Sequence, residues 1–157
     1  IFTQIFPFLT MNTEMGFYTK LSQRQNETTL ITFYLYFTSI AIGLILLFVE
    51  IMIYTGYNDF LWINQSQKYI RMAAFYSALI WILRILTYVV DAYGLTIYAE
   101  YSRLVQRVIG LGFILFLFFS NSLNLTTLFL QHYVISIALI IVLLIIINKK
   151  MNRKIIE

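Results

Sequence analysis

Long apolar stretches separated by short polar breaks dominate the chain, and this pattern predicts membrane-crossing helices. A helix that spans the hydrocarbon core, about 30 Å thick, needs about 20 mostly apolar residues. On this criterion we expect crossings at about residues 29–54, 72–98, 104–119 and 125–148. Polar connections at residues 55–68 and 120–124 separate the outer pairs. The pattern therefore predicts an all-α, polytopic membrane protein with three to four transmembrane helices.

The boundary between the second and third crossings depends on Gly94, the only helix breaker in that region. Residues 72–119 therefore form either two crossings or one long, bent helix that lies partly in the membrane plane. Farther along, no formally charged residue occurs from Val108 to Asn148. At about 1.5 Å per residue this stretch is too long for one perpendicular helix. We expect a helical hairpin with its turn at residues 120–124.

Composition places the chain among integral membrane proteins. Of its 157 residues, 61% are hydrophobic and 11% are charged, and the mean hydropathy is +0.81, values far from those of soluble domains. Residues 1–27 are more polar, and we interpret them as an interfacial or partner-bound arm before a transmembrane domain, residues 28–148. With no cysteine and one histidine, His132, the chain lacks the ligands for a thiolate metal site or a bis-histidine haem site. We therefore expect no cofactor and no metal site.

Two ionisable residues, Arg84 and Asp91, lie inside the second expected crossing. An ionisable side chain at bilayer depth is costly, so it marks a candidate site that faces protein or a wet cavity. Ser77, Arg84, Asp91 and Tyr98 recur every seven residues, and Tyr88 lies between the two charges. Seven residues make nearly two helical turns, so the charges share a face about 10 Å apart and cannot pair directly. The stripe fits a proton relay, or charges on a neighbouring subunit that direct assembly.

Three further polar residues of the expected crossings are candidates for the same path. Glu50 lies near the end of the first crossing, where its carboxylate is either interfacial or at depth. Gln131 and His132 lie in the fourth crossing, where such side chains form interhelical hydrogen bonds or handle protons. The candidates for a proton path are therefore Glu50, Arg84, Tyr88, Asp91, Gln131 and His132.

Positive charge is concentrated on one side of the expected topology. With four crossings, both ends of the chain and the connection near Arg103 share this side, and its excess of Lys and Arg predicts the matrix or cytoplasmic face. In the basic tail, residues 149–157, we expect four cations to bind the headgroups of phospholipids such as cardiolipin. These cations are Lys149, Lys150, Arg153 and Lys154. The net charge of +4 then requires no nucleic-acid partner.

The segment Phe48–Ile53 (FVEIMI) resembles the membrane glutamate motif of the smallest core membrane subunit of respiratory complex I. That family has a second carboxylate in its next helix, followed by Ala and then Gly-Leu, and Asp91–Leu95 (DAYGL) is similar. The resemblance implies that Glu50 and Asp91 are paired members of the hydrophilic proton path along the membrane arm. The chain departs from the family in having Asp in place of Glu and a polar arm where the family has a helix.

A second resemblance is to the last two helices of ATP synthase subunit a, and it is carried by Leu83–Leu86 (LRIL) and Gln131–Ser136 (QHYVIS). In that family an essential arginine faces the c-ring and a glutamine lies opposite it. The resemblance implies these roles for Arg84 and Gln131. The residues that follow the arginine in that family are missing here, so this resemblance ranks below the first.

The apolar residues of the chain are mainly Ile, Leu, Phe and Tyr, and this composition resembles that of proteins encoded by AT-rich organellar genomes. Together these patterns predict a membrane subunit of a respiratory-chain complex in the mitochondrial inner membrane, first of all in the proton-translocating arm of complex I. We expect it to perform no redox chemistry itself, to have both termini on the matrix side, and to have other subunits and phospholipids as partners. The alternatives are a structural accessory subunit of another complex such as cytochrome oxidase, an ATP synthase-like channel subunit, and an independent small channel or transporter.

Overall fold

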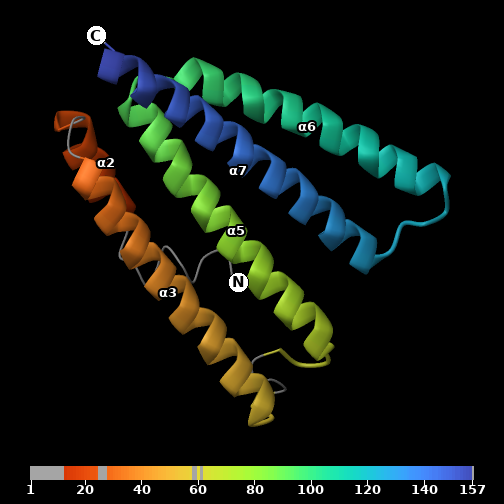
Figure 1. Ribbon diagram of the computed structural model, residues 1–157. Coiled ribbons are helices and arrows are strands. Elements are labelled where there is room, and N and C mark those ends of the chain that lie inside the picture. The colour runs from red at the N-terminus through yellow and green to blue at the C-terminus, as the bar shows by residue number, and fades with distance from the viewer. Residues whose placement is uncertain (1–12, 25–27, 58–59, 61, 157) are drawn as a thin grey trace.

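The computed structural model describes residues 13–24, 28–57, 60 and 62–156, and every long element within them is a helix. In chain order these are α2 (Thr13–Gln23), α3 (Thr28–Tyr54), α5 (Gln67–Ala92), α6 (Thr96–Phe119) and α7 (Leu125–Ile156), as Figure 1 shows. Four of them, α3, α5, α6 and α7, are long and apolar enough to cross a membrane. The all-α, polytopic fold expected from the sequence is confirmed.

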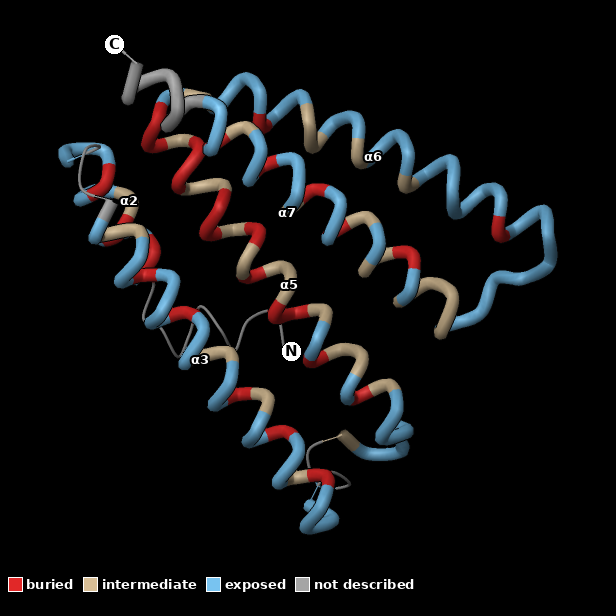
Figure 2. Tube along the Cα trace, viewed as in Figure 1, coloured by how far each residue is buried: buried red, intermediate tan, exposed pale blue. Residues whose placement is uncertain are grey.

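Helix α5 lies at the centre of the bundle, because it contacts all four other helices. The shorter α2 and the long α3 pack on one side of it, and α7 packs along another, with α6 beyond α7 (Figure 1). Figure 2 shows the consequence: buried positions follow α5, whereas α6 is exposed along most of its length. A charged residue on α5 can therefore meet groups from several helices.

A glycine turn separates α5 from α6. Gly94 has a φ of +70°, in the left-handed region that a side chain disfavours. The amide of Leu95 donates to the carbonyl of Val90 at 3.0 Å, which closes the end of α5 in the manner of a Schellman motif. Residues 72–119 therefore form two helices, and the alternative of one long, bent helix is wrong.

The expected hairpin turn at residues 120–124 is present between α6 and α7. Asn121 supplies the left-handed residue, with a φ of +51°, and the amide of Ser122 donates to the carbonyl of Leu117 at 3.1 Å. At the other side of the turn, the side-chain oxygen of Asn124 accepts from the amide of Thr127 at 2.9 Å, as a helix N-cap does. The polar break thus both ends one helix and starts the next.

Several helix boundaries differ from the sequence prediction. Helix α5 begins at Gln67 rather than residue 72 and ends at Ala92 rather than Tyr98, and α6 begins at Thr96 rather than residue 104. The backbone of α7 remains helical to Ile156, past the expected end at residue 148. Hydropathy excluded the charged turns at these ends, but charged residues near the headgroups do not stop a helix.

Candidate functional site

The buried carboxylate of Glu14 from α2 pairs with Arg84 of α5. Nη1 of Arg84 donates to Oε1 of Glu14 at 3.2 Å, and Nε1 of Trp81 donates to Oε2 of the same carboxylate at 3.4 Å. The side chain of Glu14 is 2% exposed and that of Arg84 is 41% exposed. Arg84, which cannot pair directly with Asp91 along its own helix, therefore pairs with Glu14, a residue that the sequence analysis did not single out.

Helix α2 is held in place by a narrow buried face that carries this carboxylate. Glu14, Phe17 and Leu21 are the buried residues of α2, and their spacing places them on one side of the helix. The ring of Phe17 stacks on that of Tyr34 from α3, with 4.1 Å between centroids. The ring of Tyr18 lies 5.9 Å from that of Tyr88 on α5. Aromatic packing therefore brings Glu14 to the middle of α5.

The charged residues of α5 lie far apart along the helix. Arg71 and Asp91 are 20 positions apart, about 30 Å along a helix, which is close to the thickness of the hydrocarbon core. Arg84 lies between them, about 10 Å from Asp91 on the same measure. Its partner Glu14 is 2% exposed, so the pair of Arg84 and Glu14 is more buried than the pair of Arg71 and Glu50.

Glu50 forms an exposed ion pair at the far end of α5 from Asp91. Nε of Arg71 lies 2.9 Å from Oε1 and 3.2 Å from Oε2 of Glu50, and Nη2 lies 3.1 Å from Oε2. Both side chains are more than half exposed, 51% for Arg71 and 55% for Glu50. This geometry favours the interfacial alternative for Glu50. Glu50 and Asp91 do not come together.

Asp91 lies in the last turn of α5, beside the glycine turn. Its Oδ1 is buried and has no hydrogen-bond partner within the described residues. The predicted stripe of four residues on one helix is wrong at Tyr98, because α5 ends at Ala92 and Tyr98 lies on α6. In the turn itself, burial raises the pKa of the Tyr93 hydroxyl above its usual value, so this group stays neutral at physiological pH.

Gln131 and His132 take part in helix packing. Nε2 of Gln131 donates to the backbone carbonyl of Gly110 on α6 at 2.8 Å. A Cβ on Gly110 would lie 3.4 Å from Cδ1 of Ile135 on α7, so Gly110 lies at the contact between α6 and α7. The ring of His132 lies 5.4 Å from that of Tyr76 on α5. These are the interhelical contacts that the sequence analysis weighed against proton handling.

The predicted proton-path residues do not form one continuous site within the described part of the chain. Arg84 and Tyr88 line the same cavity. Glu50 lies at the other end of α5, and Gln131 and His132 pack against α6 and α5 respectively. No group of three or more His, Asp or Glu side chains able to hold a metal ion occurs among the residues described.

No family model, curated protein or solved structure matches this chain. Its function must therefore be argued from its own residues and their geometry.

The predicted lipid-binding tail is described only at its start. Lys149 is exposed near the end of α7. The side chains of Lys150, Arg153 and Lys154 lie outside the described residues, although the helical backbone of α7 continues through these positions. Their expected contact with phospholipid headgroups stays a prediction.

Proposed function

We propose that this chain is a non-catalytic membrane subunit of a mitochondrial respiratory-chain complex, in the proton-translocating membrane arm of complex I, with both termini on the matrix side. The observation that carries the proposal is the pairing of Arg84, inside an apolar helix, with the buried carboxylate of Glu14 from the same chain. Arginine does not deprotonate in proteins, so an arginine at this position favours holding helices together over passing protons. The role of the chain is then to complete the helical assembly of the arm.

The outer surface of the bundle supports membership in a larger membrane assembly. Large apolar side chains are exposed along α3 and α6, and a surface of this kind requires lipid or the helices of other subunits. Gly43 on α3 has open space around the position of a Cβ, so another helix can approach the backbone closely there. The organelle-like composition supports the mitochondrial inner membrane as the location.

A second candidate function is direct membership of a proton path, and the carboxylate of Asp91 favours it. Its Oδ1 is buried without a hydrogen-bond partner among the described residues, and such groups are costly unless a partner or water completes them. A neighbouring subunit could supply that partner. Because Glu50 lies about 30 Å away along α5, the two carboxylates would serve separate points of a path.

The first test is co-migration of the tagged chain with complex I on a native gel of detergent-solubilised membranes. Co-migration with cytochrome oxidase instead would make the chain an accessory subunit of that complex. A chain that migrates alone and conducts ions after reconstitution would be an independent channel. Either result contradicts the proposed membership in complex I.

The second test separates assembly from proton transfer. In the assembly role, Arg84→Met lowers the amount of assembled complex, whereas Asp91→Asn leaves proton pumping per assembled complex unchanged. In the relay role, Asp91→Asn lowers pumping per complex while assembly stays normal. Pumping is measured in vesicles and is normalised to the complex seen on the native gel.

A further inference from the structure

An arginine-lined cavity of about 360 Å³ opens between α5 and the first half of α6. Three arginines, Arg84, Arg103 and Arg107, are among the residues that line it. Glu14 pairs with the first of them, and Glu100 pairs with Arg103 at 2.8 Å. Arg107 has no ion pair within the described residues, so the group retains an excess positive charge.

Arg103 contributes an additional sign of an absent ligand. Its Nη1 is used by Glu100, but its Nε is buried and has no hydrogen-bond partner in the described part of the chain. A buried donor without a partner is costly. An anion in the cavity would supply a hydrogen-bond acceptor for Nε of Arg103 and a negative charge to balance that of Arg107.

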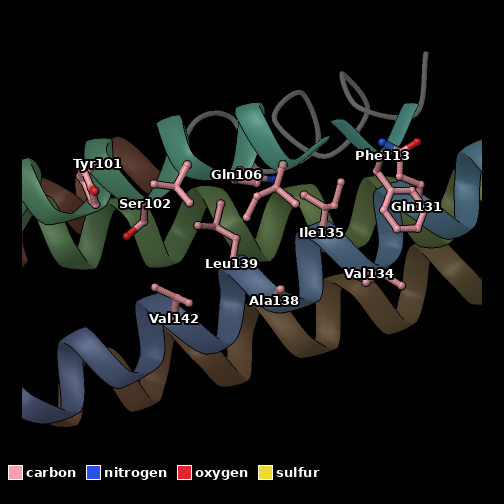
Figure 3. Close-up of a pocket in the computed structure, with 12 residues that line it drawn as sticks. Tyr101, Ser102, Gln106, Phe113, Gln131, Val134, Ile135, Ala138, Leu139 and Val142 are labelled. Carbon is pink, nitrogen blue, oxygen red and sulfur yellow. The ribbon is translucent and has the colours of Figure 1, made fainter. Parts of the chain in front are cut away.

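A separate, apolar groove of about 370 Å³ runs between α6 and α7. Figure 3 shows its course: Tyr101 and Ser102 lie at one end, and Phe113 and Gln131 lie at the other. From Tyr101 to Phe113, α6 rises about 18 Å. Half of the hydrocarbon core is about 15 Å, so the groove is long enough to hold one acyl chain across one leaflet.

The cavity and the groove adjoin each other. Gln106 from α6 and Leu139 from α7 line both of them. Arg103 follows directly after Ser102, which lies at one end of the groove. The protein therefore places the arginine-lined cavity beside the apolar groove, where Gln106 and Leu139 lie between the two ends of the groove.

We propose that the joined cavity and groove bind one anionic phospholipid, with its phosphate among the arginines and one acyl chain between α6 and α7. The guanidinium fork matches phosphate oxygens in pairs, and basic pockets between transmembrane helices suit anionic headgroups. A neutral amphiphile such as a quinone would leave the excess positive charge uncompensated. This site is distinct from the basic tail and does not depend on the identity of the complex.

The experiment measures lipid affinity of the purified full chain in neutral detergent by native mass spectrometry. Phosphatidylglycerol and phosphatidylcholine with the same acyl chains are the probes. The double variant Arg103→Gln/Arg107→Gln should lower the affinity for phosphatidylglycerol by about 25-fold, about fivefold for each cation, and should leave that for phosphatidylcholine unchanged. The charge-matched control Lys20→Gln/Lys68→Gln removes two exposed cations that line neither the cavity nor the groove and should change the affinity by less than about fivefold.

A second variant tests the groove while every charge stays in place. Ala138 is an exposed residue of the groove. Ala138→Trp should fill the groove and lower the affinity for phosphatidylglycerol at least as much as the replacement of one arginine does, about fivefold. If circular dichroism shows that the arginine variant does not fold, Ala138→Trp tests the proposed lipid site in its place. Glycerol phosphate, which has no acyl chain, should not displace the lipid.

The proposal is overturned by any of four results. These are equal affinities for the two phospholipids, an equal loss in the Lys20→Gln/Lys68→Gln control, no effect of Ala138→Trp, and displacement of the lipid by glycerol phosphate or by a long-chain quinone at similar concentrations.

Discussion

Replacing Arg84 with methionine isolates its ion pair with Glu14. The change keeps a long, unbranched side chain on α5 but removes the donor to Oε1 of Glu14. Glu14, which is 2% exposed, would retain the 3.4 Å hydrogen bond from Trp81 and lose this cation. A buried carboxylate without its cation is the costly state, so we expect α2 to detach from α5 before the rest of the bundle unfolds.

The magnitude follows from the geometry. At 3.2 Å and an effective dielectric constant of about 20, two unit charges attract by about 5 kcal/mol. Desolvation of the two ions opposes most of this, but removal of one partner from a buried pair costs about 3–5 kcal/mol. Because Arg84 is 41% exposed, we expect the lower value, about 3 kcal/mol, for Arg84→Met. The double variant Glu14→Leu/Arg84→Met has no unpaired charge and should lie within about 1 kcal/mol of the wild type.

The assay is reversible unfolding in mixed detergent micelles, followed by tryptophan fluorescence. The chain has two tryptophans, so a Trp62→Phe background leaves Trp81, which contacts Glu14, as the reporter. The matched control is Lys20→Met, since Lys20 is exposed on α2, lies outside the arginine-lined cavity and has no ion pair within the described residues. That control should change the free energy of unfolding by less than about 0.5 kcal/mol.

Two results would refute this reasoning. In one, Arg84→Met destabilises the protein no more than Lys20→Met does. In the other, the double variant is as unstable as the sum of its single variants, which would mean that Glu14 and Arg84 do not interact energetically. Either result would also remove the observation that carries the proposed function.

Three further changes test the packing. Gly94→Ala places a side chain at a φ of +70° and should lower the free energy of unfolding by about 1–2 kcal/mol, whereas its control Gly112→Ala, where a Cβ meets open space, should be neutral or stabilising in the same denaturation assay. Gln131→Leu removes an interhelical hydrogen bond and should cost about 0.6 kcal/mol by that assay; a gain in stability would show that the bond is not formed. Glu50→Gln breaks an exposed ion pair and should cost less than about 1 kcal/mol, with the difference shrinking in high salt; a larger, salt-independent loss would place Glu50 at depth.

Hydropathy was sufficient to predict the four long helices and the turn between α6 and α7, because each crossing is a long apolar stretch and each polar break contains a residue type that favours a turn. Asn121 and Gly94 both occupy left-handed positions that these residue types tolerate. The prediction that the polar stripe of α5 continues to Tyr98 was wrong because of the left-handed residue at Gly94. A left-handed residue at Gly94 changes the direction of the chain, so a seven-residue period has no meaning across it.

The partner of Arg84 could not be predicted from periodicity within α5. The contact joins residues 70 positions apart, and the polar composition around Glu14 is also typical of an interfacial segment. The useful signal was local: Glu14, Phe17 and Leu21 have the spacing of one helical face, with a carboxylate beside two apolar residues. A carboxylate on an apolar face indicates a buried cation elsewhere in the chain.

The pairing of Glu14 with Arg84 also imposes an order on biogenesis. During synthesis Glu14 leaves the ribosome long before Arg84, and a carboxylate without its cation is costly to transfer into lipid. We therefore expect helix α2 to pack against α5 and α3 only after α5 has been inserted. Helix α2 is the first helix along the described chain, but on this reasoning it reaches its final position only after α5 has been inserted.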